Sequence, residues 1–321
     1  MDEPIAPPSA APVNRVPGLI LIITAAVLVL IAVLIMYFQQ KDGRFIEFAF
    51  ARLTPIGEEA VVLKDGELAS PTLGMEGQAV SYLKASGVEV ALVRTLAATS
   101  TGTAVVNPFK VDAYLLGAAP RQLTSDGMPK TGLAVSADGQ TIAYAYLDAS
   151  KNPQVLLTPT LADWRIALVD VASGAVTDLG QGYRPQLVDG ILVYAALDGI
   201  HVYSIADGAG VTSSLISGAA AVSLDLAADG GHLIYRDPVT LRHAIFAVSA
   251  LYPELVLAPV GQSPASFIDA AVSGDTLYGL ASNEAGGTEV RAFALDDLSS
   301  AGTIVHSFPA GSLIGRLIPQ E

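Results

Sequence analysis

Short apolar runs that begin near a glycine recur along most of this chain. Five of them have a tyrosine four or five residues after the glycine, and successive tyrosines are 41 to 62 residues apart. The glycine–tyrosine pairs are Gly77/Tyr82, Gly139/Tyr144, Gly190/Tyr194, Gly231/Tyr235 and Gly274/Tyr278. A sequence period of this length is typical of repeat architectures, in which each unit buries its faces against its neighbours.

Each unit contains four short runs rich in Val, Ile, Leu, Ala and Tyr, separated by turn residues. Such runs favour antiparallel strands. The sequence therefore predicts an all-β fold over residues 45–321, a β-propeller of four-stranded blades. Five units are legible, and a sixth blade built from both termini would close the ring, with Glu59–Gly66 as its final strand and Ser312–Ile318 as its first. Six blades are expected, and five or seven also fit the spacing.

One unit carries a family resemblance. Leu133–Tyr146 reads LAVSADGQTIAYAY, which resembles the S-P-D-G-x-x-I-A-F/Y repeat of TolB-type, WD-like propellers, with Ala137 in place of the proline. Pro120–Thr124 resembles the P-R-x-L-T strand that closes a blade in those repeats, and Ile166–Gly174 resembles their third strand and turn. The resemblance implies the propeller architecture. Because TolB-type propellers are exported bacterial proteins, it also implies an extracytoplasmic domain.

An uncharged, mostly apolar block runs from Val16 to Phe38. At ~1.5 Å per residue, a helix of this length crosses a hydrocarbon layer of ~30 Å. The block is longer than a signal-peptide core, and no A-x-A cleavage pattern follows it. We therefore predict an uncleaved, single-pass transmembrane helix at 16–38 that contacts the lipid bilayer. A disordered, proline-rich tail at 1–15 is expected before it and a linker at 39–44 after it.

The orientation of this helix is less constrained. Arg15 is the basic residue before the block, and Lys41, Arg44 and Arg52 follow it. Taken alone, the positive-inside rule places the C-terminal side in the cytoplasm, although large domains translocate largely regardless of charge. The TolB resemblance favours the opposite orientation. The expected location is the cell membrane, with the propeller on the extracytoplasmic side.

Composition and motifs exclude several functions. The net charge is −14 and lysine and arginine are not clustered, so nucleic acid is not an expected partner. Without cysteine the chain has no disulfide, thiolate nucleophile or cysteine-ligated metal. Gly261–Ala265 lacks the second glycine of a nucleophile elbow, and the four histidines have no metal-ligand spacing. Propeller enzymes of the prolyl-oligopeptidase type carry their chemistry in a separate hydrolase domain. The prediction is therefore no enzyme activity, no catalytic or metal-binding residue and no cofactor.

Two insertions, Thr95–Val106 and Asp148–Asp163, lengthen the first two units, and such loops commonly bind partners. The predicted interaction residues lie in or beside them, and they are Trp164, Thr99, Asn107 and Asn152. The predicted function is a membrane-anchored, non-catalytic propeller that acts as a protein-interaction module or as an accessory or assembly subunit of a membrane protein complex. The alternative is an extracytoplasmic propeller that binds or senses a sugar, peptide or ion.

Overall fold

The computed structural model describes residues 48–54, 57–64, 67–85, 87–98, 104–148, 159–188, 190–213, 222–227, 230–237, 240–250 and 252–319. The chain divides after residue 45, and all described residues belong to the second part. The predicted tail, transmembrane helix and linker (1–15, 16–38 and 39–44) lie outside them, as do Thr99 and Asn152. Over the described ranges, no helix is both long enough and apolar enough to span a bilayer.

Strands dominate this part of the chain, and they form six four-stranded sheets, here named blades A to F. Blade A contains β24 (Ile314–Pro319), β1 (Phe48–Thr54), β2 (Gly57–Lys64) and β3 (Glu67–Ala69). Blade B contains β4 (Gln78–Ala85), β5 (Val88–Ala98), β6 (Ala104–Leu115) and β7 (Arg121–Gln122). Blade C contains β8 (Lys130–Val135), β9 (Thr141–Leu147), β10 (Trp164–Asp170) and β11 (Val176–Gln181), with a short 3-10 helix, η2 (Leu161–Asp163), before β10.

The other three blades follow in chain order. Blade D contains β12 (Tyr183–Val188), β13 (Ile191–Ala196), β14 (Gly199–Ser204) and β15 (Ala209–Ser213). Blade E contains β16 (Val222–Ala227), β17 (Gly230–Arg236), β18 (Arg242–Ala250) and β19 (Val256–Ser266). Blade F contains β20 (Asp269–Ser273), β21 (Thr276–Ser282), β22 (Thr288–Ala294) and β23 (Thr303–Ser307). Each blade is given from its first strand to its fourth, and hydrogen bonds join neighbours in that order.

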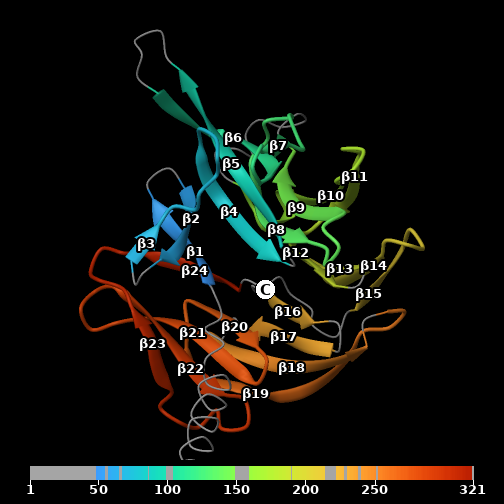
Figure 1. The fold of residues 1–321 in the computed structure, drawn as a ribbon. Coiled ribbons are helices and arrows are strands. Elements are labelled where there is room, and N and C mark those ends of the chain that lie inside the picture. The colour runs from blue at the N-terminus through green and yellow to red at the C-terminus, as the bar shows by residue number, and fades with distance from the viewer. Residues whose placement is uncertain are drawn as a thin grey trace, which may run out of the picture. The chain divides into compact units, whose positions relative to one another are not determined.

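The six blades form a closed ring. First strands of successive blades contact one another from β4 through β8, β12, β16 and β20 to β24, and β2 of blade A contacts β4 of blade B. Figure 1 shows the sheets arranged around one axis. The predicted six-bladed propeller is therefore confirmed, and five or seven blades are excluded.

Blade A joins the two ends of the described chain. Strand β24 pairs antiparallel with β1, with Phe48 opposite Pro319 and Arg52 opposite Ile314. The prediction of a blade built from both termini is confirmed. The assignment of Glu59–Gly66 as its final strand is wrong, because β2 is the third strand and the three-residue β3 is the outermost. So short a strand has too few residues to show an alternating pattern.

The glycine–tyrosine repeat holds in four blades and fails in blade B. Tyr144, Tyr194, Tyr235 and Tyr278 lie on the second strands of blades C, D, E and F, but Tyr82 lies on the first strand of blade B. Leu92 on β5 stands five residues after a turn glycine, Gly87, as Tyr144 stands after Gly139, and both side chains are buried in one cluster. Gly77 serves another purpose, because a Cβ there would lie 2.4 Å from Val93.

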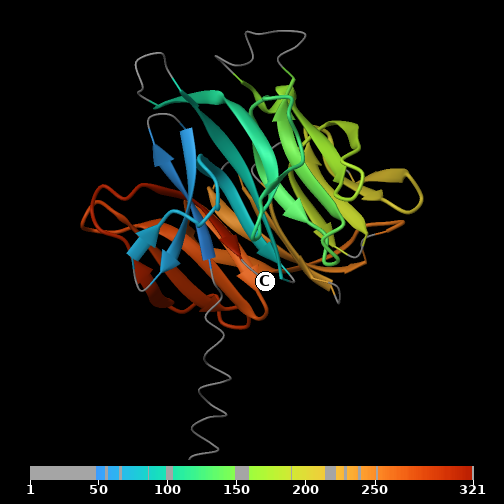
Figure 2. The ribbon, with the colours of Figure 1, turned by 45° about the horizontal axis from the view of Figure 1, so that its top comes forward.

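The ring has two faces, which the alternating strand directions define. The entry face carries the turns between first and second strands, and β1 begins there at residue 48. The connection face carries the links between second and third strands and between blades. The described ends of both predicted insertions, at 95–98, 104–106 and 159–163, lie at the ends of second strands or at or before the starts of third strands, and so belong to the connection face (Figure 2). The insertion at 95–106 is a lengthened hairpin, because β5 and β6 remain paired up to Ala98 and Ala104.

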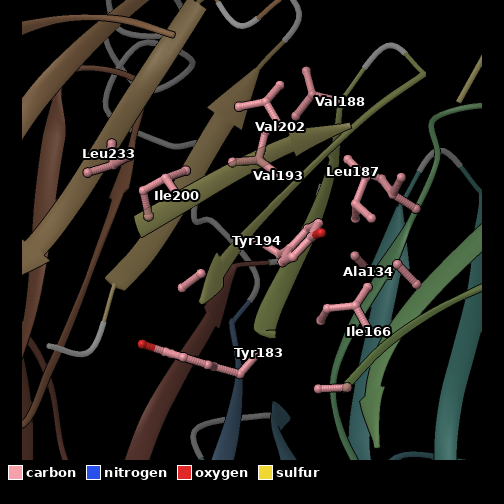
Figure 3. Close-up of a cluster of buried hydrophobic side chains, with 14 of the residues drawn as sticks. Ala134, Ile166, Tyr183, Leu187, Val188, Val193, Tyr194, Ile200, Val202 and Leu233 are labelled. Atoms are coloured by element: carbon pink, nitrogen blue, oxygen red, sulfur yellow. The ribbon is translucent and has the colours of Figure 1, made fainter. Parts of the chain in front are cut away.

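Apolar side chains fill the spaces between neighbouring blades. Five buried clusters occupy the six interfaces, and the largest joins blades C, D and E. In Figure 3 Leu187 of blade D lies on the side of Ile166 in blade C, and Ile200 lies on the side of Leu233 in blade E. Both sheet faces of a blade are therefore covered, which explains why inner strands such as β9 and β13 are apolar at nearly every position.

The turn of the best-matching repeat shows how the sequence determines this geometry. The Ser136 hydroxyl donates to Oδ1 of Asp138 at 2.6 Å, and Asp138 accepts a bond from the Gln140 amide at 3.0 Å. Gly139 has φ +69°, a left-handed conformation that glycine adopts without a Cβ clash. Ala137, which replaces the proline of the TolB-type pattern, is exposed, so this substitution leaves the turn intact.

Replacing Gly139 by alanine should destabilise the protein more than the same change at the corresponding turn of blade F. The new Cβ would lie 2.5 Å from Val88 of blade B, in addition to the strain of the positive φ. Gly274 has φ +56°, but a Cβ added there would meet no atom within 4 Å, so Gly274→Ala isolates the strain. We expect about 1–2 kcal/mol for Gly274→Ala and about 1–3 kcal/mol more for Gly139→Ala in urea unfolding. Equal losses would contradict the contact with Val88.

Candidate functional site: charged residues at the connection face

Buried charged and histidine side chains gather at the connection-face ends of the strands. In the described part of the chain these residues are Glu59, Arg94, Asp112, Lys130, His243, Asp269 and Glu289. Most stand near the beginning of a first or third strand, which is the end that meets the connection face. Ionised groups are costly to bury without partners, so their concentration at one end of the ring marks this end as the candidate functional site.

Five residues from four blades form what we name the axial cluster, and they are Arg184, Arg236, His243, Asp269 and Arg316. Arg236 ends β17 and His243 lies near the start of β18, and the two are directly opposite in the β17–β18 pair. Opposite residues in a strand pair project to the same face of the sheet. The His243 ring stacks on Phe267 at 6.3 Å between centroids, and its backbone amide donates to the Ser263 hydroxyl at 2.9 Å.

Asp269 lies at the centre of the rest of the cluster. Its Oδ1 is 3.8 Å from Nη1 of Arg184, and its Oδ2 accepts a hydrogen bond from the Leu317 amide at 3.0 Å. Arg316 precedes Leu317 on β24, and its Nη2 lies 3.6 Å from Oε2 of Glu58. One buried carboxylate therefore stands beside two guanidinium groups, one from blade D and one from blade A.

A second group of charged residues lies at the connection face of blades A and B. Nη1 of Arg94 donates to Oε1 of Gln78 at 3.0 Å, and Glu58 and Glu59 attract this buried guanidinium. Burial nevertheless lowers the pKa of Arg94. Glu59 also pairs with Arg52, with 2.7 Å between Oε2 and Nη2. Among the described residues, no three His, Asp or Glu side chains are grouped as metal ligands.

Strained backbone accompanies the axial cluster. Apart from glycines, the described residues with positive φ are Arg184 at 51° and Leu241 at 57°. Arg184 lies in an irregular stretch of β12 where the register shifts between Tyr183 and Gln186, and Leu241 directly precedes β18. Left-handed conformations cost ~1–3 kcal/mol outside glycine and concentrate at functional sites. Both residues lie at the connection face.

Burial and positive neighbours control protonation in the cluster. Burial, together with the positive charges of Arg236 and Arg184, lowers the pKa of His243 to about 4, so the ring is neutral at physiological pH. Burial raises the pKa of Asp269, although Arg184 and Arg316 act in the opposite direction. Within the described chain, Nδ1 of His243 and Nε of both Arg236 and Arg316 are buried without a hydrogen-bond partner.

The His243 pKa predicts acid sensitivity. Between pH 6.5 and 4 the unfolded histidine binds a proton that the folded one excludes, so stability falls as pH drops through this range. The full loss is about 3 kcal/mol. His243→Phe retains a ring beside Phe267 and cannot titrate, so its free energy of unfolding should exceed that of the wild type by a growing margin below pH 6.5. Parallel pH profiles for the two proteins, measured by urea unfolding, would contradict this explanation.

A buried lysine at the connection face connects blades B and C. Lys130 Nζ lies 3.7 Å from Oδ1 of Asp112, contacts Asp126 and donates to the Val111 carbonyl at 2.7 Å. The ammonium also lies over the Tyr144 ring, 5.5 Å from its centroid. Asp112 accepts further bonds from the hydroxyl of Thr124 and the amide of Gly127. The pair is fully desolvated and well coordinated, which is typical of a structural ion pair.

Of the residues predicted from the sequence, Trp164 and Asn107 belong to strand ends at the same face, on blades C and B, which contribute no residue to the axial cluster. Trp164 begins β10 in blade C, is half-buried and packs against the largest apolar cluster. Asn107 lies on the extended part of β6, and its side chain is outside the described set, as are Thr99 and Asn152. Sequence reasoning missed the axial cluster. Its signal was faint: Arg184, Arg236 and Arg316 each stand at or near the end of a predicted strand.

Exposed apolar residues gather at the same face of the ring as the cluster. Of the twelve large apolar side chains that are exposed in the described ranges, six lie at the connection face, and they are Leu53, Leu161, Leu197, Leu241, Ile268 and Leu313. They come from five blades, and Leu53 and Leu313 are joined by a backbone hydrogen bond of 2.8 Å. We name this set the apolar rim. Exposed apolar groups that gather on one face are typical of interaction surfaces.

Comparison with known proteins identifies the fold. No protein-family model matches the sequence, and no curated protein does. Among solved structures, the chain is similar to TolB from Acinetobacter baumannii, with a TM-score of 0.52 and 11% identity, over 86% of this chain and 65% of the TolB chain. The matched part is thus less than two thirds of TolB. At this identity the likeness shows the fold alone, a TolB-like six-bladed propeller.

A second similar structure corrects one prediction. Oligogalacturonate lyase from Vibrio parahaemolyticus matches with a TM-score of 0.52 and 9% identity, over 82% of this chain and 79% of the lyase chain. The propeller is therefore most of that enzyme. The prediction that this chain is not an enzyme assumed that propeller enzymes need a separate catalytic domain. That prediction is wrong, because the lyase consists mostly of the propeller.

Proposed function

We propose that this protein is a membrane-anchored, TolB-like propeller that binds a protein partner through its connection face, as an accessory or assembly subunit of a membrane complex. The observation that supports this most is the apolar rim, which places exposed leucine or isoleucine side chains from five blades on one face. The extended ends of β5 and β6 and residues 159–163 before β10 belong to the same face. Loops and apolar groups together are what a protein partner would contact.

The anchor and its orientation are part of this proposal. The apolar block 16–38 would tether the propeller to the bilayer, and a short linker would raise its effective concentration near membrane partners. Because β1 begins at the entry face, a partner on the connection face would bind on the side of the ring opposite to the start of this strand. The TolB-like fold supports an extracytoplasmic propeller by analogy with exported proteins.

Site-specific photo-crosslinking in native membranes tests the proposed face. A photoreactive amino acid would replace Leu241 or Leu313 on the apolar rim, and Val176 at the opposite end of blade C as a matched control, since it is similarly exposed. We expect one discrete adduct from both rim positions and none from Val176. If no position gives a crosslinked adduct, or if only Val176 does, the proposal is refuted.

Protease shaving of intact cells tests the orientation. An extracytoplasmic propeller should be accessible before lysis, whereas protection until lysis would place it in the cytoplasm. Extraction with carbonate and with detergent tests the anchor separately. If the full chain is extracted from membranes only by detergent, and a variant lacking 16–38 is released without it, the predicted transmembrane helix is supported. Release of both proteins by carbonate would contradict it.

A further inference from the structure

One ion pair of the axial cluster crosses the ring. The contacts between successive first strands place blade D opposite blade A and two positions away from blade F. Nη1 of Arg184 in blade D nevertheless lies 3.8 Å from Oδ1 of Asp269 in blade F. Apolar packing holds neighbouring blades together, whereas this pair joins two blades that are not neighbours. It therefore connects the two sides of the ring at the connection face.

The same carboxylate also holds the terminal strand. Oδ2 of Asp269 accepts a hydrogen bond from the backbone amide of Leu317 on β24, with 3.0 Å between the two atoms. Because β24 is the innermost strand of blade A, β1 pairs with one of its edges and the other edge faces the axis. Buried amides on an edge without a partner strand need other acceptors. Asp269 supplies one, and its two oxygens thus connect blade A with blade D.

We propose that Arg184, Asp269 and the Leu317 amide form a latch across the ring, through which blade D controls the local opening of β24. The Arg184 cation stabilises the Asp269 carboxylate in its buried position, where an ionised group without a partner is costly. When Arg184 moves away, the hydrogen bond to Leu317 weakens and β24 separates from β1 more readily. These two strands come from opposite ends of the described chain, so no hairpin turn holds them together.

The backbone around Arg184 supports this role. Arg184 has a φ of 51° and precedes Pro185, although a residue before proline prefers an extended backbone. Such strain persists where surrounding contacts hold the residue in place. Gly132 of blade C leaves the necessary space, since a Cβ added there would lie 3.1 Å from Cδ of Pro185 and 3.6 Å from the Arg184 backbone. Two neighbouring blades thus hold a strained backbone in the position from which Arg184 reaches Asp269.

Arg184 is the accessible member of the latch. Its side chain is 30% exposed, whereas that of Asp269 is 7% exposed. Arg184 lies at the connection face, where the proposed partner would bind, and β1 of blade A is the strand that follows the predicted anchor. A partner that binds Arg184 would therefore loosen the blade next to the anchor. This consequence rests on the proposed function, but the latch itself does not, so its test uses the full chain alone.

Hydrogen–deuterium exchange of the full chain in detergent provides the test, measured by mass spectrometry on peptides from β24 and from β9. Strand β9 contacts β12, which carries Arg184, so it reports any effect that is merely local. We expect Arg184→Gln to speed exchange in β24 at least about fivefold and to leave β9 unchanged. Arg165→Gln is the matched control, since it removes an arginine that pairs with Asp178 on blade C, and it should leave β24 unchanged.

Two further variants separate the latch from a general loss of stability. Arg184→Lys keeps the positive charge, so exchange in β24 should lie between the wild type and Arg184→Gln, and this variant replaces Arg184→Gln if the latter does not fold. In an Asp269→Asn background, Arg184→Gln should add little to exchange in β24, because the carboxylate that transmits its effect is already absent. Unchanged exchange in β24, equal acceleration in β24 and β9, or additive effects of the two substitutions would each overturn the proposal.

Discussion

A chain that ends at Ser312 should lose its cooperative unfolding transition. It would lack β24, which provides the first strand of blade A and contacts β20 of blade F. Ile314 and Leu317 are 2% and 5% exposed, and their burial contributes about 1.5–3 kcal/mol each. Their removal would also expose Phe50 and Phe308, which pack edge to face at 5.1 Å. The combined loss is comparable to the whole stability of a typical domain, about 5–15 kcal/mol.

Circular dichroism during urea titration of the full chain and the shortened chain would measure this effect. Leu317→Ala serves as the milder variant and should cost about 2–5 kcal/mol while leaving a cooperative transition. A synthetic peptide of residues 312–319 should restore part of the lost stability, because the ring is closed by strand pairing and side-chain packing alone. A shortened chain as stable as the intact one would show that β24 does not close the ring.

Lys130→Met should be the most damaging single substitution at the connection face. It leaves Asp112, which is 1% exposed, as a buried carboxylate without its cation, a change that typically costs about 3–5 kcal/mol. Methionine fills a similar volume, so the loss reflects charge rather than a cavity. The free energy of unfolding from urea titration would measure it, with an intact far-UV spectrum as the check on folding.

The matched double variant isolates the ion pair. Lys130→Met with Asp112→Asn removes both charges, and it should be less destabilised than the sum of the two single variants. Arg165→Gln, which breaks an exposed pair with Asp178, should cost less than about 1 kcal/mol. Additive losses at Lys130 and Asp112 would show that the two charges do not interact.

The sequence contained enough information to predict the architecture. Turn glycines and alternating apolar runs are local signals, so the blades, their number and the joining of the two termini followed from them. The position of a strand within its blade was predicted wrongly where one residue type serves two purposes. Gly77 is needed for a close approach to Val93 rather than for a hairpin turn, and this contact between strands cannot be recognised from the neighbouring letters.

The axial cluster could not be predicted in this way. Arg184, Arg236 and Arg316 are far apart in the chain and come from different blades, so no spacing rule connects them. Their meeting depends on the closed ring and on the local backbone of Arg184, whose positive φ is unexpected for a residue before proline. Trp164 stood out because it is the single tryptophan, and its half-buried side chain packs against the largest apolar cluster.

The pairing of β24 with β1 also determines when this protein can become complete. The innermost strand of blade A is the last part of the propeller to leave the ribosome, whereas its three partner strands are made first. Throughout synthesis, blade A presents an unpaired edge at β1, and such edges invite association with other chains. Closure of the ring therefore requires that β24 has been synthesised, and until then the edge of β1 is open to association with other chains.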